Sequence, residues 1–232
     1  MTTICNLLRS VESFNHNSEN QFFLKKIFTF YIERCDTMQY IELARKLMPS
    51  DIPVHEVSLP TLYQAARLPT PSFWPDAKGE YTAGIMVPKM KIQESLTELQ
   101  KWVPDDPYTY LSIENLLNGN KLLDLNESMS PQLYATFSIL HELGHWYDFQ
   151  DRYRAVGLSG KQYYSDYTEE QSRLNLDEIT KQIHTQTRGS REQMDLLILY
   201  HETYRQHPFE RIADQYAINN LRERNQECNA LE

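Results

Sequence analysis

The chain has 232 residues, of which 41% are hydrophobic and 24% charged, and its formal net charge is −9. This composition excludes an intrinsically disordered chain and fits one large domain, or one domain with an appended subdomain. The acidic balance and the lack of a basic stripe argue against nucleic-acid binding, which relies on Lys and Arg side chains that neutralise phosphates.

The cysteines and the N-terminus give an expectation about the compartment. Cys5, Cys35 and Cys228 are odd in number and widely spaced, so we expect free thiols and neither a disulfide framework nor a cysteine zinc site. No apolar run reaches the roughly 18–20 residues that span a bilayer. The only charge among the first ten residues, Arg9, follows the apolar residues, unlike in a signal peptide. We therefore expect no membrane span and a cytosolic protein, in its own cell or delivered into a host cell as an effector.

Residues 1–70 are predicted to form a helical N-terminal region, either a subdomain or a cover. Apolar side chains at helical spacing predict a helix over 20–34, and a second amphipathic helix over 37–48 ends at Pro49. Five further prolines up to Pro75 exclude long regular elements there. We place a boundary near residue 70, with a second domain over 71–232.

The next segments alternate between strand and helix patterns. Short apolar runs over 81–87 and 121–125 predict two strands, and 91–102 predicts a helix. Either strand could offer an open edge to which an extended peptide substrate adds.

The last hundred residues are predicted to be mainly helical. Ser130 before Pro131 is a typical helix start, and that helix should run to about residue 150. After a loop over 153–167, three helices are expected, at 169–186, 191–206 and 209–224, with breaks at Gly189 and Pro208. The predicted fold is α+β and mostly helical, with a small sheet beside the helix that starts at residue 131.

The motif His141-Glu142-Leu143-Gly144-His145 lies inside this helix. Histidines four residues apart lie on one helix face, so both imidazoles can bind one ion. Zinc accepts imidazole nitrogens and lowers the pKa of bound water to about 7, and Glu142 would be the general base that takes the proton. The motif predicts His141 and His145 as zinc ligands and Glu142 as the catalytic base, with a structural histidine pair as the alternative.

A zinc site needs a third protein ligand. Glu210 is the best candidate, because Glu210 and Asp214 lie four apart on the last predicted helix and face one way. Asp214 would accept a hydrogen bond from the far nitrogen of His141 and fix its tautomer. A solvated helix face is the alternative interpretation of this pair. The alternative third ligands are Glu169, Glu170, His184, His201 and His207.

These motifs resemble a group of peptidases. HELGH followed by a glutamate on a later helix resembles the gluzincins, and ERIADQYA over 210–217 is similar to the ExxAD element of HtpX-type and neprilysin-like peptidases. Over about 121–220 the sequence also resembles a soluble domain, the catalytic domain of anthrax lethal factor and of related bacterial toxin and effector peptidases. Those show HExGHxxD, a tyrosine and an acidic segment, and here HELGHWYD over 141–148 precedes Tyr204 and ERIAD. Asp214 stands where they have glutamate, and the spacing from the tyrosine to Glu210 is shorter.

The resemblance implies a zincin-like catalytic domain, one zinc ion and hydrolysis of peptide bonds in a protein or peptide substrate, as in an effector or toxin. It also implies that Tyr204 donates a hydrogen bond to the oxyanion of the tetrahedral intermediate. The alternative donors in the same stretch are His201, His207 and Arg205.

Two other functions compete with an endopeptidase. The first is a regulatory metalloprotein that acts on a repressor, similar to the ImmA/IrrE group. That group carries its glutamate ligand nearer the second histidine and often a helix-turn-helix, and this sequence shows no basic recognition helix. The second is a non-catalytic zinc-binding module. Glu142 argues against it, because a structural site needs no base and prefers four protein ligands.

Overall fold

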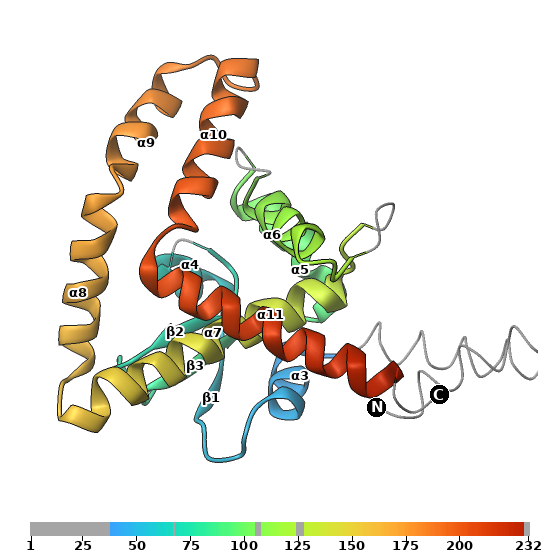
Figure 1. Ribbon diagram of the computed structural model, residues 1–232, viewed down its shortest axis with the longest axis vertical. Helices are drawn as coiled ribbons and strands as arrows, with labels where there is room; N and C mark the ends of the chain where they lie inside the picture. The colour runs from blue at the N-terminus through green and yellow to red at the C-terminus, as the bar shows by residue number, and fades with distance from the viewer. Residues whose placement is uncertain (1–37, 67, 105–107, 124–127, 230–232) are drawn as a thin grey trace, which may run out of the picture.

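The computed structural model describes residues 38–66, 68–104, 108–123 and 128–229. Helices dominate this part of the chain, and a three-stranded sheet completes it (Figure 1). The predicted α+β, mostly helical class is therefore confirmed. The helix predicted over 20–34 lies outside the described residues.

The helices and strands follow one another in this order: α3 (Tyr40–Leu47), β1 (Val54–Val57), α4 (Leu59–Ala66), β2 (Ser72–Trp74), β3 (Gly84–Pro88), the 3-10 turn η1 (Ile92–Glu94), α5 (Ser95–Trp102), α6 (Tyr108–Gly119), α7 (Pro131–Arg152), η2 (Arg154–Val156), α8 (Gly160–Arg173), α9 (Leu176–Thr185), α10 (Arg191–Tyr204) and α11 (Pro208–Asn229).

The sheet has the order β1-β3-β2, with β1 parallel and β2 antiparallel to β3. The strand predicted over 81–87 is confirmed as β3, although it begins later, at Gly84. Its expected open edge is wrong, because β1 and β2 pair with both sides of β3. Among the described residues the free edges of the sheet belong to β1 and β2.

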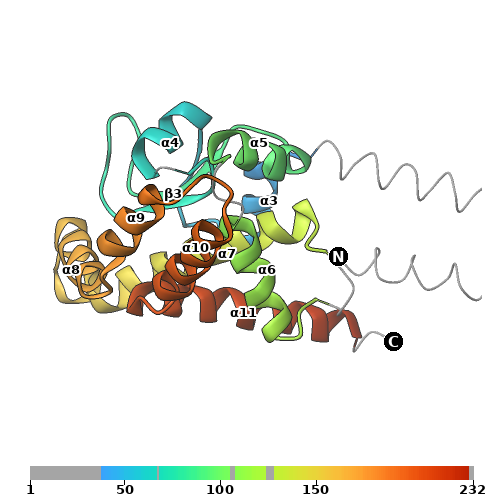
Figure 2. The ribbon, with the colours of Figure 1, turned by 90° about the horizontal axis from the view of Figure 1, so that it is seen from above.

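Helices cover both faces of the sheet. Ile85 and Val87 lie in the main hydrophobic core with residues of α3 and α7, whereas Met86 packs with Trp74 and Leu62 of α4. This alternation follows the two-residue period of a strand. Seen from above, the order from one side to the other is α4, the sheet, α7 and α11 (Figure 2).

The two longest helices, α7 and α11, lie side by side and run in opposite directions (Figure 1). The predicted helix start is confirmed, since the Ser130 hydroxyl accepts the Leu133 N–H and Pro131 is the first residue of α7. Gly144 permits the close contact between the helices: a Cβ atom there would lie 2.7 Å from the Cα atom of Ala213. This close approach brings side chains of both helices within bonding distance.

Between α7 and α11 the chain forms α8, α9 and α10, and two predictions there are wrong. The expected loop over 153–167 ends early, because Ser159 caps α8 by accepting the Gln162 N–H. The helix expected over 169–186 is broken between α8 and α9 at Asn175, whose φ of 55° is a left-handed conformation that asparagine tolerates.

The strand predicted over 121–125 is also wrong at its first three residues. Lys121 has a φ of 57°, and the Leu122 N–H donates to the Leu117 carbonyl, a bond that closes the end of α6. Leu123 lies in an irregular segment after α6, and its side chain is buried. Residues 124–125 lie outside the described part.

The predicted boundary near residue 70 falls between β1 and β2, two strands of one sheet. Side chains of α3 such as Tyr40 and Leu43 belong to the same core as α7. The described part of residues 1–70 thus builds the same core as the residues that follow. No helix in the described ranges is both long and apolar enough to span a bilayer.

Candidate metal centre

Facing side chains of α7 and α11 bring the three predicted metal ligands together. His141 Nε2 lies 3.2 Å from Glu210 Oε2, His145 Nε2 lies 3.4 Å from Glu210 Oε1, and the two Nε2 atoms are 3.2 Å apart. One possible ligand atom from each residue lies within 4.8 Å of the other two, and no other such group exists in the described ranges. His145 and Glu210 are 6% and 4% exposed, so the group could hold a metal ion out of bulk water.

In both imidazoles the Nδ1 atom, on the ring side away from Glu210, has a hydrogen-bonding partner. His141 Nδ1 donates to Asp214 Oδ1 at 2.9 Å, as predicted, and His145 Nδ1 lies 3.0 Å from the Tyr163 hydroxyl. Each ring therefore turns its Nε2 towards Glu210. Metal-binding histidines are typically oriented by such a partner on the other ring nitrogen.

Burial and neighbouring charges shift the pKa values of His141 and Glu210 in opposite directions. Burial would lower the pKa of His141, but the Asp214 and Glu210 carboxylates raise it to about 10. Burial raises the pKa of Glu210, and the charges of His145 and His141 outweigh this and hold it well below its usual range. The carboxylate and imidazoles thus form a set of mutually attracting groups.

Glu142 lies beside this group without belonging to it. Its Oε2 accepts the backbone N–H of Phe73, in β2, at 2.7 Å. Burial raises the pKa of Glu142, although the nearby histidines and the Phe73 N–H oppose the rise. The carboxylate is therefore anchored between the free edge of the sheet and the group that could hold a metal ion.

Tyr204 lies at the site, where burial and the carboxylate of the candidate ligand Glu210 raise the pKa of its hydroxyl. Its hydroxyl is 2.9 Å from the Tyr167 hydroxyl, which donates to Glu210 Oε1 at 2.8 Å. Burial and nearby carboxylates raise the pKa of Tyr163 and Tyr167 well above the usual value, so both hydroxyls stay protonated. The sequence did not single out Tyr163 and Tyr167, because their segment was predicted as a loop. Their four-residue spacing on a helix would have been the signal.

The alternative ligands and donors have other contacts. Glu169 and Glu170 pair with Arg173, and His184 is exposed on α9. None of the three lies with His141 and His145.

Two further alternatives contact residues around the centre. The buried His207 donates from Nε2 to the Tyr167 carbonyl and accepts the Phe209 N–H at Nδ1, so both of its nitrogens are used. Arg205 forms an ion pair with both oxygens of Asp214, at 2.7 and 2.8 Å. His201 lies outside the group of His141, His145 and Glu210, and it lines the cleft next to that group, which is described below.

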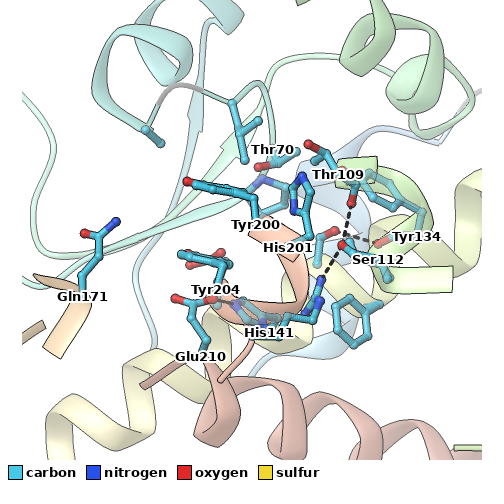
Figure 3. A pocket seen from close by; sticks show the side chains of 18 of the residues that line it. Thr70, Thr109, Ser112, Tyr134, His141, Gln171, Tyr200, His201, Tyr204 and Glu210 are labelled. Atoms are coloured by element: carbon cyan, nitrogen blue, oxygen red, sulfur yellow. Dashed lines mark hydrogen bonds and ion pairs between the residues drawn. The ribbon is translucent and has the colours of Figure 1, made fainter. Parts of the chain in front are cut away.

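The group opens onto a cleft of about 630 Å³. His141, Tyr204 and Glu210 lie together at one end, and Thr70 and Thr109 lie across from them (Figure 3). The walls come from the end of α4 and the segment that follows it, and from α6, α7, α8 and α10. Apolar side chains that line them are Ala65, Leu68, Pro71, Ile113 and Phe137.

Comparison with protein-family models, with curated proteins and with solved structures gave no match. The candidate metal centre is therefore recognised by its own residues and geometry: two histidines and a glutamate from two adjoining helices, a second glutamate beside them, and a cleft at their open side.

Proposed function

We propose that the protein is a zinc-dependent endopeptidase of the gluzincin type, with a zincin-like catalytic domain. The observation that carries the proposal is the buried group of His141, His145 and Glu210 with Glu142 beside it at the edge of a cleft.

The donor set fits zinc. Two imidazole nitrogens and one carboxylate oxygen are the ligands of one kind of catalytic zinc site, whereas structural sites prefer four protein ligands. The described residues offer three ligands in this group. A zinc ion held by these residues would supply Lewis-acid activation of water and of a carbonyl group.

The chain's own residues supply the rest of the chemistry. Glu142 takes a proton from the attacking water and later gives it to the leaving amine. The Phe73 N–H holds the Glu142 carboxylate in one orientation, so the base is positioned before substrate arrives. Tyr204 is the proposed donor to the oxyanion.

Glu142→Gln tests this proposal, because glutamine keeps the shape of the side chain and cannot act as a base. Zinc content and cleavage of a peptide library are measured for the wild type, Glu142→Gln and the control Glu169→Gln, whose carboxylate pairs with Arg173 on α8. We expect equal zinc content in all three and a loss of cleavage of about 100-fold or more in Glu142→Gln alone. Unchanged cleavage by Glu142→Gln, or a wild type that binds no zinc, would contradict the proposal.

A further inference from the structure

Helix α8 carries two tyrosines that reach two of the three candidate ligands. Tyr163 and Tyr167 are four residues apart, so they lie on one face of α8. The Tyr163 hydroxyl lies 3.0 Å from His145 Nδ1, and the Tyr167 hydroxyl donates to Glu210 Oε1 at 2.8 Å. With Asp214 behind His141, each of the three ligands has one hydrogen-bonding partner behind it.

Tyr163 is held by an aromatic cluster. Its ring meets Phe73, Phe149, Tyr153 and Phe209 nearly edge-on, at centroid distances of 5.0–5.6 Å. Only 2% of its surface is exposed. This packing fixes the position of the ring, and with it the hydroxyl that contacts His145 Nδ1.

Tyr167 is held by His207, the residue just before α11. Its ring lies 4.2 Å from that of His207, and the His207 Nε2–H donates to the Tyr167 carbonyl at 3.0 Å. His207 is fully buried. Because His207 is only three residues before Glu210, this contact ties α8 to the same turn that supplies the third ligand.

The two hydroxyls suit these positions chemically. A hydroxyl that accepts the Nδ1–H of His145 keeps a hydrogen off Nε2 and leaves the Nε2 lone pair for a metal ion. A hydroxyl that donates to Oε1 of Glu210 leaves Oε2 as the free ligand atom. We propose that α8 is a clamp on the metal centre, with Tyr163 and Tyr167 as positioning residues that set its metal affinity. This inference rests on the metal centre of the proposed function.

The test removes each hydroxyl and keeps each ring. Metal-free wild type, Tyr163→Phe, Tyr167→Phe and the double variant are titrated with zinc against a coloured chelator. Tyr153→Phe is the matched control, because Tyr153 belongs to the same aromatic cluster and its hydroxyl donates to Asp166 and not to a ligand. We expect each single variant to lose roughly 10- to 100-fold in zinc affinity, the double variant to lose more, and the control to stay within about twofold. The visible spectrum of the cobalt-loaded protein should shift in the same variants.

Distinct outcomes separate this inference from the proposed function. If the wild type does not bind zinc, the metal centre itself is wrong. If the wild type binds zinc and Tyr163→Phe and Tyr167→Phe bind it equally well with unchanged cobalt spectra, the clamp is wrong and the metal centre stands. A loss in Tyr153→Phe as large as in Tyr163→Phe would also overturn the clamp, because packing and not the hydroxyl would then set the affinity.

Discussion

Asp214 is the residue on which the orientation of His141 depends. It is buried, accepts from His141 Nδ1 and pairs with Arg205. Asp214→Asn keeps the shape and removes the charge, so we expect zinc affinity to fall by roughly 10- to 100-fold. The control is Asp195→Asn, an exposed carboxylate on α10. Equal zinc affinity of the two variants in a chelator competition would show that Asp214 does not support the site.

Tyr204 is the proposed oxyanion donor, and it lines the same cleft as His141 and Glu210. Its hydroxyl contacts Tyr167 and not a ligand histidine. As an oxyanion donor it should matter more for turnover than for metal binding, so Tyr204→Phe should lower kcat by about 100-fold with a much smaller change in zinc affinity. A normal kcat on a cleaved peptide would assign the donor elsewhere.

Five of the site residues could be predicted from sequence, because the His141–His145 motif defines a site that needs a third ligand and helical spacing pairs the remaining candidates. His141 with His145, and Glu210 with Asp214, are i, i+4 pairs on helices with clear start signals, and Glu142 is adjacent to the first ligand. The tyrosine partners were missed because their segment was predicted as a loop, so their four-residue spacing was not read as one helix face. That spacing signals only a shared helix face; which residues the two hydroxyls contact depends on how α8 packs against α7 and α11.

At the scale of elements, Gly144 sets the separation of α7 and α11. A Cβ atom there would lie 2.7 Å from a backbone atom of Ala213, which cannot move aside as a flexible side chain could. We expect Gly144→Ala to lower the free energy of unfolding by about 1–3 kcal/mol and to weaken zinc binding, because the ligands lie on both helices. In Gly119→Ala, where no atom lies within 4 Å, stability should be unchanged or slightly higher. Urea unfolding of the two variants measures the difference, and equal stabilities would contradict this account of the helix contact.

The long helices were predictable and the sheet mostly was not. Ser130 marks the beginning of α7 as its N-cap, and Pro208 is the first residue of α11, a position that proline favours. By contrast, β1 and β2 have only four and three residues, and pairing with β3 stabilises them. The apolar residues after α6 resemble a strand in sequence, yet they close that helix, because the Leu122 N–H finds its acceptor at Leu117.

At the scale of the whole molecule, a bound ion would join segments that are far apart in sequence. His141 and His145 lie about 65 residues before Glu210, so zinc would bind the folded chain and stabilise it. At free zinc 100-fold above Kd the gain is about 2.7 kcal/mol, which for a chain of this size raises Tm by roughly 5–10 °C. Glu210→Ala should lose most of this rise in thermal unfolding with and without zinc. A Tm that does not respond to zinc in the wild type would contradict a site that spans both helices.

The zinc K-edge X-ray absorption spectrum of the loaded protein tests the central claim most directly, because it reports which atoms bind the ion. We predict nitrogen and oxygen neighbours at about 2.0–2.2 Å, with the multiple-scattering pattern of two imidazoles, and loss of one imidazole in His145→Ala. Sulfur neighbours at about 2.3 Å would place the zinc on cysteines, and a spectrum unchanged by His145→Ala would place it away from α7. Either result would contradict a centre built by His141, His145 and Glu210.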